Sequence, residues 1–411
     1  MVGTMRFGDT AAIVRLTMAS VPRFFTPPAG HFFLFGPRGT GKTWWARQAY
    51  PNALHVDLLD PETVRRLGAR PERLREMIAA APTADAVVID EVQKLPELLE
   101  VVHAVIEEGR RRGGGPRFVL TGSSPRKLRR GGVNLLGGRA AECWLHPYMA
   151  AELGTQFHFA AAAESGLLPV IHGAEEPQAN LSAYNALYIR EEVQAEGLVR
   201  SVGSFARFLE AISFSHASVL NLANVARECE VSRKTAEGYL DILEDLLLGY
   251  RLPVFSRRAK RQLAAHPKFY FFDAGVFRAN RPAGPLDEPG EIDGAALEGL
   301  VAQHLRAWCH YSPGRHQVSY WLTRSQVEVD FVIYGESGIH AVEVKNTGRI
   351  RPEHLRGLKA FGADYPTARL ALLTRSRERL VIDGVTCLPV DEFLAGLTPG
   401  TPPLSIEGRT A

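Results

Sequence analysis

The chain has 411 residues, of which 45% are hydrophobic and 23% charged, and its formal net charge is +3. These values are ordinary for a globular protein of two or three domains. A charge so near zero excludes a protein that binds nucleic acid through a basic field over its whole surface. The four cysteines form no C-x-x-C pair, so they predict reduced thiols and neither a disulfide framework nor a zinc site. No apolar run is long enough for a membrane span and no signal peptide is evident, so we expect a cytoplasmic protein without a membrane partner.

The first 180 residues alternate short apolar segments with helical ones. Helical spacing is found at residues 62–80, with a break at Pro71, and at residues 96–111. Alternating strands and helices are typical of a parallel sheet covered by helices, so residues 1–180 predict an α/β domain. The predicted strands are residues 32–35, 54–56, 87–90, 117–121 and 142–145.

A complete P-loop follows the first predicted strand. The sequence Gly-Pro-Arg-Gly-Thr-Gly-Lys-Thr matches G-x-x-x-x-G-K-[ST] and stands between an apolar strand and a helical segment. Backbone N–H groups of such a loop, and the N-terminus of the helix after it, bind phosphate oxygens. Lys42 is expected to reach the β- and γ-phosphates, and the Thr43 hydroxyl to ligate Mg²⁺, so we predict ATP and Mg²⁺ as ligands. The residues predicted to bind the nucleotide are Gly36, Pro37, Arg38, Gly39, Thr40, Gly41, Lys42 and Thr43.

Two carboxylates end the third predicted strand. Asp90 fits the position of the aspartate that holds Mg²⁺ in P-loop enzymes. Glu91 is placed to polarise an attacking water, so we expect it to be the catalytic base. The fourth strand ends in Thr-Gly-Ser-Ser, where Ser123 either senses the γ-phosphate of the nucleotide or caps the next helix. Both interpretations of Ser123 are open at this stage.

A basic, glycine-rich loop at residues 127–139 precedes the fifth predicted strand. Its last residue, Arg139, is a candidate for stabilising charge on the transferring phosphoryl group. Arg139 would act either in its own subunit or on a nucleotide bound by a neighbouring copy, and the second case requires a homo-oligomer. The alternative is a solvated loop arginine, and the sequence does not choose between these roles.

This block resembles the AAA-type ATPases of a bacterial and archaeal family in which the ATPase is followed by a C-terminal domain of unknown function. The resemblance implies an AAA-type P-loop fold and ATP hydrolysis, and it continues with less specific motifs to the C-terminal part of the chain. Many AAA relatives have an asparagine sensor where this chain has Ser123. The motifs that carry the resemblance are residues 36–43, 89–94, 120–124, 136–139, 145–148 and 152–153.

Residues 181–280 predict a helix-turn-helix. A helix, a short turn, the good N-cap Ser232 and a second helix follow one another, and two later apolar runs fit a pair of wing strands. The block therefore resembles a winged helix. The predicted helices are residues 202–214, 220–231 and 233–247, and the predicted strands are residues 250–255 and 269–272.

The winged-helix resemblance makes DNA a candidate partner. In versions that read DNA, the second helix enters the major groove by its N-terminal residues, here Arg233 and Lys234. The basic run at residues 257–261 would lie in the wing and contact phosphates. However, the same helix carries acids, and such a fold also serves as a contact surface for proteins, so a protein partner is the alternative. The acids are Glu237, Asp241, Glu244 and Asp245.

Residues 294–397 carry a second group of chemically capable residues. A predicted helix holds Glu298, and two predicted strands with alternating polarity are joined by a glycine-containing turn. If the strands form a hairpin, Asp330, Glu343 and Lys345 converge in the D…E-x-K arrangement of the PD-(D/E)xK nuclease fold, which this block resembles. The proline usual before the aspartate is absent, since Val329 stands there. The predicted helix is residues 295–308, and the strands are residues 327–334 and 339–345.

The nuclease resemblance implies a restriction-endonuclease-like α/β domain. Asp330 and Glu343 would hold Mg²⁺, which would polarise a phosphodiester. Lys345 would orient water or stabilise developing charge, and Glu298 would supply the helical acid that this superfamily often carries. The alternative is a hairpin with cross-strand salt bridges in a fold without activity. The proline-rich residues 398–411 are predicted to be disordered.

Two functions from different classes follow from this sequence. The leading prediction is an ATPase of three modules whose nucleotide state changes its contact with DNA. The alternative is an ATP-dependent regulatory switch that binds a protein partner, with Asp330, Glu343 and Lys345 in a structural role.

Overall fold

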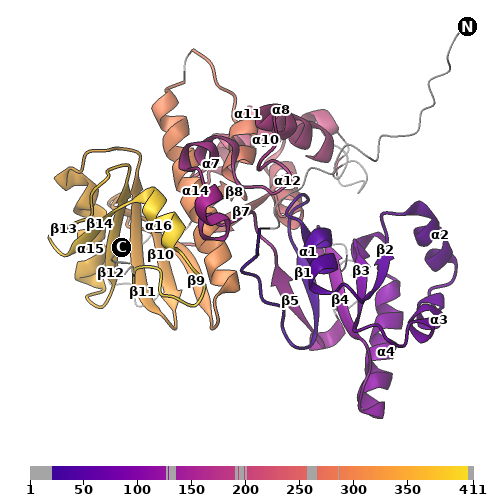
Figure 1. Cartoon of the computed structure of the whole chain (residues 1–411). Helices are drawn as coiled ribbons and strands as arrows, with labels where there is room; N and C mark the ends of the chain where they lie inside the picture. Colours follow the sequence, from indigo (N-terminus) through magenta and orange to yellow (C-terminus); the bar gives the residue numbers. More distant parts are fainter. Residues whose placement is uncertain are drawn as a thin grey trace, which may run out of the picture.

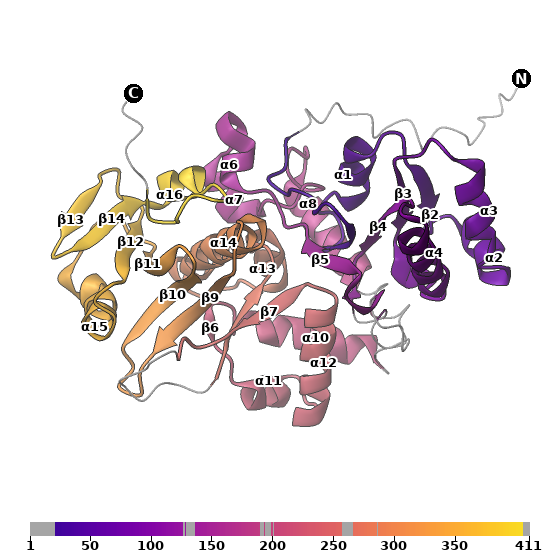
Figure 2. The same ribbon diagram turned by 90° about the horizontal axis from the view of Figure 1, so that it is seen from below.

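The structure is a computed structural model, and it describes residues 21–125, 128, 136–189, 193, 199, 201–256, 266–285 and 287–405. Figure 1 shows the two larger sheets at opposite ends of the molecule, with a mostly helical middle block between them. The view in Figure 2 shows the same order of the three blocks.

The first sheet has five parallel strands in the order β2-β3-β4-β1-β5. All five strands predicted from the sequence are present, and the prediction of a parallel sheet is confirmed. Since β1 lies between β4 and β5, the loop that follows β1 starts inside the sheet and not at its edge. The strands are β1 His31–Phe35, β2 Leu54–Asp57, β3 Ala86–Asp90, β4 Arg117–Gly122 and β5 Ala140–Trp144.

Helices cover both faces of this sheet, because its strands are apolar on both sides. In β1, Phe33 and Phe35 pack with residues of α2, α3 and α4, whereas Phe32 and Leu34 pack on the opposite face with Trp45 of α1. The predicted break at Pro71 separates α2 from α3. The helices are α1 Lys42–Ala49, α2 Pro61–Ala69, α3 Arg73–Ala80 and α4 Leu98–Arg112, and the 3₁₀ segments are Val92–Lys94 and Leu136–Gly138.

The chain after β5 leaves the first sheet earlier than predicted. Ala162 and Leu167 pack in the same core as α14, and Leu181 packs in the core of the middle block. Met149 and Leu153 lie in the core of α14 as well, so the chain packs with the later blocks from residue 149 onward, whereas the predicted first domain reaches residue 180. The elements of this segment are α6 Ala150–Leu153, a 3₁₀ turn Gly154–Gln156, α7 Phe159–Ser165, α8 Pro177–Ala183 and a π-helical segment Tyr184–Ile189.

The middle block contains a helix, a turn and a second helix beside a small antiparallel sheet of order β6-β8-β7. The predicted cap is present, because the Ser232 hydroxyl accepts a hydrogen bond from Thr235 N at 3.1 Å. The basic run at residues 257–261 lies outside the described residues. The elements are α10 Val202–Ser213, β6 Ser218–Val219, α11 Leu222–Glu228, α12 Arg233–Asp245, β7 Gly249–Leu252, β8 Lys268–Phe271 and α13 Ala274–Asn280.

The third block is a six-stranded mixed sheet of order β13-β14-β12-β11-β10-β9, with the long helix α14 packed beside it. The predicted hairpin is present, since β10 and β11 pair antiparallel with Phe331 opposite Val342. None of the described helices, α14 included, is long and apolar enough to cross a membrane. The elements are α14 Pro289–Tyr311, β9 His316–Leu322, β10 Glu328–Gly335, β11 Gly338–Lys345, a 3₁₀ turn Pro352–Leu355, α15 Arg356–Asp364, β12 Arg369–Thr374, β13 Leu380–Ile382, β14 Val385–Pro389 and α16 Val390–Gly396.

The prediction of disorder from residue 398 onward is wrong for residues 398–405. The indole N–H of the buried Trp308 donates to the carbonyls of Thr398 and Thr401, each at 3.1 Å. Leu404 packs against the same core. A buried indole needs an acceptor, and the proline-rich segment supplies two. Residues 406–411 lie outside the described residues.

Candidate functional site

The P-loop closes tightly between β1 and α1. Glycine is required at position 36, because a Cβ atom there would lie 2.4 Å from the carbonyl oxygen of Leu145. Gly39 has a φ of +81°, which side-chain-bearing residues rarely adopt. The Lys42 ammonium is buried against the loop and donates to the carbonyls of Gly36 at 2.8 Å and Pro37 at 3.1 Å. It thus points into the loop whose backbone would hold the phosphates.

The residues predicted to hold Mg²⁺ are in direct contact. The Thr43 hydroxyl donates to Asp90 Oδ2 at 2.6 Å, and the Thr121 hydroxyl donates to the other oxygen of Asp90. Asp90 is only 5% exposed. Hydroxyl and carboxylate oxygens are the donors that Mg²⁺ prefers, so this pair fits the ion that would accompany a bound nucleotide.

Glu91 is held beside the metal pair by three neighbours, Thr121, Gln93 and Ser123. It has a left-handed φ of +56°, and its backbone N–H donates to the Thr121 hydroxyl at 3.2 Å. The Gln93 amide donates to the Glu91 carboxylate and to Ser123 Oγ, the latter at 2.9 Å, and Ser123 Oγ lies 3.3 Å from Glu91 Oε2. Ser123 therefore orients the predicted base in this structure, and its role as a γ-phosphate sensor stays a prediction.

Arg139 lies at the opposite end of the sheet from the P-loop. Strands β1 and β5 run parallel, with His31 opposite Ala140 and Phe35 opposite Trp144. Arg139 precedes β5, so a whole strand of about 16 Å separates it from the end where the P-loop begins. Its guanidinium forms an ion pair with Glu107 of α4. Action on the nucleotide of its own subunit does not fit this geometry, and action on a neighbouring copy stays a prediction.

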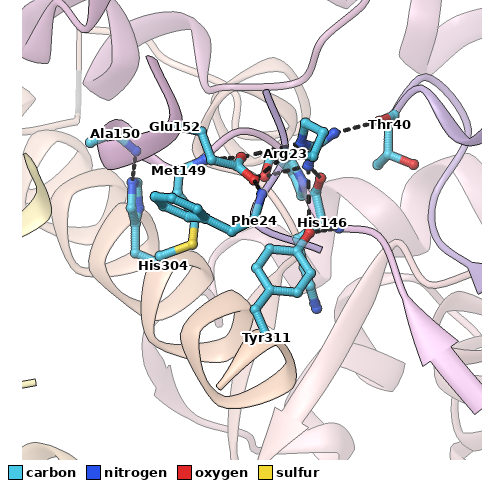
Figure 3. A network of polar contacts seen from close by, with 10 residues as sticks. Arg23, Phe24, Thr40, His146, Met149, Ala150, Glu152, His304 and Tyr311 are labelled. Atoms are coloured by element: carbon cyan, nitrogen blue, oxygen red, sulfur yellow. Dashed lines mark hydrogen bonds and ion pairs between the residues drawn. The ribbon is translucent and has the colours of Figure 1, made fainter. Parts of the chain in front are cut away.

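Figure 3 shows a buried polar network around Arg23, which precedes the first sheet. The Nε of Arg23 lies 3.2 Å from both oxygens of Glu152, and the two side chains are only 3% and 0% exposed. Arg23 Nη1 also donates to the carbonyl of Thr40 in the P-loop at 3.0 Å, and Nη2 donates to the carbonyl of His146 at 2.5 Å. The network therefore attaches the P-loop to the chain that follows β5.

Helix α14 joins this network from the third block. The hydroxyl of Tyr311, at the end of the helix, accepts from His146 N at 2.9 Å. Two turns earlier, His304 Nε2 accepts from Ala150 N at 2.9 Å, and its Nδ1 donates at 2.7 Å to a carbonyl one turn back in the helix. These two bonds place the single ring proton on Nδ1. The helix that carries Glu298 thus contacts the group that holds the P-loop.

The β10–β11 hairpin brings together the residues that the sequence singled out in the third block. Asp330 N donates to Glu343 Oε2 at 3.3 Å, and Lys345 Nζ lies 2.7 Å from Glu343 Oε1. Asp330 and Glu343 are 4% and 7% exposed. Glu298 of α14 belongs to the same group, and its Oε1 accepts a hydrogen bond from the Tyr270 hydroxyl at 2.6 Å. We call Glu298, Glu328, Asp330 and Glu343 the carboxylate cluster.

A lysine that sequence analysis did not single out lies inside this cluster. Lys268 Nζ is 3.0 Å from Glu298 Oε1 and 3.3 Å from Asp330 Oδ1, and it also forms an ion pair with Glu328. Its side chain is 2% exposed. Burial alone would lower the pKa of Lys268, but Glu298 and its other neighbours raise that pKa well above the ordinary value, so the group is an ammonium ion.

The carboxylate cluster does not fit the predicted Mg²⁺ ion. Within the described ranges, no group of three or more His, Cys, Asp or Glu residues is arranged to hold a metal. Unlike Asp90, whose partners are neutral hydroxyls, Asp330 already pairs with a cation of the protein, because its Oδ1 lies 3.3 Å from the Lys268 ammonium while its Oδ2 accepts the N–H of Val344 at 2.8 Å. Burial and the nearby Asp330 raise the pKa of Glu343, and the Lys345 ammonium at 2.7 Å opposes that rise. The geometry of the described residues therefore does not support the predicted metal-binding roles of Asp330 and Glu343.

Sequence analysis gave no role to four residues that the structure places at these sites: Thr121, Gln93, Arg23 and Lys268. Thr121 ends the strand beside β3, and that position could have marked it as a neighbour of the metal pair. Lys268 stands directly before a run of aromatic residues, and a lysine buried with such a run needs an acidic partner, so this position was a signal of a buried ion pair. Arg23 lies in no motif, and nothing in its sequence neighbourhood indicates its partner.

Comparisons with known proteins divide the chain into three parts. A family model described as an AAA domain matches residues 30–154. Two domains of unknown function, DUF8612 and DUF4143, match residues 157–286 and 293–393. The first block therefore has an AAA-type P-loop NTPase fold, as predicted. Neither of the other two descriptions names a winged helix or a nuclease, so these resemblances stay predictions.

Two uncharacterized mycobacterial proteins, Rv2008c of Mycobacterium tuberculosis and Mb2031c of Mycobacterium bovis, are each 27% identical over 372 residues, which is 88% of this chain and 80% of each relative. Among solved structures, ORC1 of Aeropyrum pernix in complex with DNA is 14% identical, with a TM-score of 0.29 over 62% of this chain and 87% of that one. AMPPCP-bound DnaA of Aquifex aeolicus is 16% identical, with a TM-score of 0.26 over 52% and 81%. Likenesses this distant carry no argument about mechanism.

We expect the Arg23–Glu152 ion pair to be strongly coupled in a double-mutant cycle of unfolding free energy. Arg23→Gln and Glu152→Gln should each cost roughly 3–5 kcal/mol, because each leaves a buried charge without its partner, and the double variant should cost less than the sum. Denaturant unfolding of the four proteins measures the coupling. The matched control is the exposed pair of Arg70 and Glu76 at 2.7 Å, whose cycle should give little coupling. Additive effects at Arg23 and Glu152 would contradict the network.

The buried His304 should make stability depend on pH. Burial lowers its pKa from 6.5 to about 4. Below pH 6.5 the unfolded chain therefore binds this proton more readily than the folded one, and stability is lost as the pH falls. At pH 5 the loss is about 2 kcal/mol relative to neutral pH. The comparison is between wild type and His304→Gln, which keeps an acceptor for Ala150 N but has no titrating ring.

The measurement is the urea midpoint of both proteins at pH 7.5 and pH 5. Other titrating groups are common to the two proteins, so the stability advantage of wild type over His304→Gln should shrink on acidification. An advantage that is independent of pH would show that His304 does not titrate as a buried neutral ring.

Proposed function

We propose that this protein is a Mg²⁺-dependent ATPase that acts as a nucleotide-driven switch. The observation that carries the proposal is the contact of Thr43 with Asp90 at 2.6 Å beside a P-loop whose lysine is directed inward. When bound, the Mg²⁺ and ATP supply a polarised γ-phosphoryl group and a charged leaving group. ATP would exchange the carbonyl partners of Lys42 for phosphate oxygens.

Glu91 is the proposed base. Its carboxylate would accept a proton from the attacking water, and Gln93 and Ser123 would hold it in position by the contacts described above. Arg139 would act only on a nucleotide held by a neighbouring copy, so full activity would need a homo-oligomer.

The switch would run through Arg23. Nucleotide binding would rearrange P-loop backbone groups, and the carbonyl of Thr40 in that loop is one of the acceptors of the Arg23 guanidinium. Arg23 and Tyr311 of α14 share His146 as a partner, at its carbonyl and its N–H respectively. A shift at Thr40 would therefore change the contacts of the helix that carries Glu298. Such a path would let the nucleotide state bias the third block.

DNA is a second candidate partner, favoured by the serine-capped helix α12 beside an antiparallel sheet. Its N-terminal Arg233 is paired with Glu237 at 3.1 Å, and Arg251 pairs with Asp241 and Glu244 along the same helix. These ion pairs offset the acidic charge that speaks against a major-groove contact. Metal-dependent cleavage of DNA is not part of this proposal, because Lys268 fills the carboxylate cluster.

We expect Lys42→Ala to abolish tight ATP binding, because the phosphates lose their compensating charge. Glu91→Gln should keep ATP binding and lose turnover by two orders of magnitude or more, about the contribution of a general base. Nucleotide affinity and phosphate release measured together separate the two effects. Exposed neighbours provide matched controls, Lys94→Ala and Glu97→Gln, which should behave as wild type. Wild-type turnover in Glu91→Gln would remove Glu91 from the role of base.

If α12 contacts DNA, Arg233→Ala together with Lys234→Ala should weaken duplex binding and reduce its dependence on salt, because two phosphate or base contacts are lost. Fluorescence anisotropy with labelled duplex at several salt concentrations measures both quantities. Arg207→Ala on α10 is the control, since it removes an exposed arginine of the same block outside this helix. If wild type does not bind duplex DNA, or if the double variant binds it as wild type does, the switch that binds a protein partner is the remaining proposal.

A further inference from the structure

We propose that Lys268 is the resident cation of the carboxylate cluster, so that the third block is a non-catalytic module in which an ionic contact with the middle block takes the place of a metal ion. The inference goes beyond ATP hydrolysis, which it does not require. Three observations support it: the position of the Lys268 ammonium, the hydrogen bonds and ion pairs already made by the carboxylates, and the origin of Lys268 in a strand of the middle block.

The position of the ammonium is the first argument. Nζ of Lys268 lies 3.0 Å from Glu298 and 3.3 Å from Asp330, and contacts Glu328 as well. A Mg²⁺ ion bridging the same acids would need oxygens at about 2.0–2.1 Å and would therefore occupy the place of Nζ. Two cations cannot share that place, because the charges repel each other in a buried site.

The occupation of the carboxylates is the second argument. Glu298 Oε1 accepts from Lys268 and from the Tyr270 hydroxyl at 2.6 Å. Glu343 Oε1 is paired with Lys345 at 2.7 Å, and its Oε2 accepts the N–H of Asp330 at 3.3 Å. Glu298, Asp330 and Glu343 thus each have two partners from the protein itself. Buried charges are stable only when paired and hydrogen-bonded in this way.

The origin of the lysine is the third argument. Lys268 begins β8, whose next residues Phe269 and Phe271 lie in the core of the middle block. The carboxylates instead come from α14, β10 and β11 of the third block. The two blocks are also joined by two backbone hydrogen bonds, from Phe255 N to the carbonyl of Tyr320 at 2.6 Å and from Tyr320 N to the carbonyl of Pro253 at 3.0 Å. The ammonium is thus the charged end of a connection between two modules, and displacing β8 would leave the cluster without its cation.

The test replaces this cation. Lys268→Met removes the charge and keeps an unbranched apolar stem, which leaves Glu298, Glu328 and Asp330 facing one another. We expect this variant to gain a stoichiometric Mn²⁺ site that wild type lacks, seen as bound Mn²⁺ by electron paramagnetic resonance and as a raised thermal midpoint with Mn²⁺. The site should vanish in Lys268→Met with Asp330→Asn. Lys345→Met is the control, because it removes the lysine paired with Glu343 alone and should gain no such site.

Three outcomes would overturn the proposal. The first is that wild type binds Mn²⁺ and that Asp330→Asn abolishes this binding. The second is that wild type cleaves plasmid DNA with Mg²⁺ or Mn²⁺ and that Asp330→Asn abolishes cleavage. A folded Lys268→Met protein that binds no more Mn²⁺ than wild type would also contradict it. If Lys268→Met does not fold, the comparison of wild type with Asp330→Asn decides alone. Wild type then supports the proposal by showing no Mn²⁺ site and no cleavage that depend on Asp330.

Discussion

The buried ion pair of Arg23 and Glu152 is the contact on which the arrangement of the P-loop relative to the rest of the chain depends. A charge pair so fully removed from water is favourable only if all its hydrogen bonds are made. Here Glu152 also accepts the backbone N–H groups of Phe24 at 2.6 Å and Met149 at 2.9 Å, while Arg23 reaches Thr40 in the P-loop. The pair thus fixes three separate segments of backbone by one set of bonds.

Helix α14 extends this constraint to the other end of the molecule. Its 23 residues span about 35 Å. Tyr311 and His304 contact the segment after β5, and Glu298, nearer the start of the helix, holds the ammonium of Lys268. One rigid element therefore lies between the nucleotide site and the carboxylate cluster. This arrangement would let a change at the P-loop reach the third block, among whose described residues no acidic group is arranged to hold a metal.

The features that depend on residues close together in the sequence could be predicted from the sequence alone. The P-loop and Asp90 follow apolar strands directly, so local pattern and residue type sufficed for the first sheet, and the hairpin brought Asp330 to Glu343 as its period of two required. What could not be predicted depends on tertiary contacts. Arg23 and Glu152 are 129 residues apart, and Lys268 lies 30 residues before Glu298 in another module. The sequence also gives no sign that another block places the ammonium of Lys268 between Glu298 and Asp330, a contact that the metal prediction did not include.

The central claim is that nucleotide binding at the P-loop reaches α14. Hydrogen–deuterium exchange of the intact protein, with and without a non-hydrolysable ATP analogue and Mg²⁺, tests it most directly. The account predicts changed exchange in residues 300–311 of α14 as well as in the P-loop, and loss of the α14 change in a protein that carries both Arg23→Gln and Glu152→Gln but still binds the analogue. Exchange changes confined to residues 30–154 in wild type would contradict it.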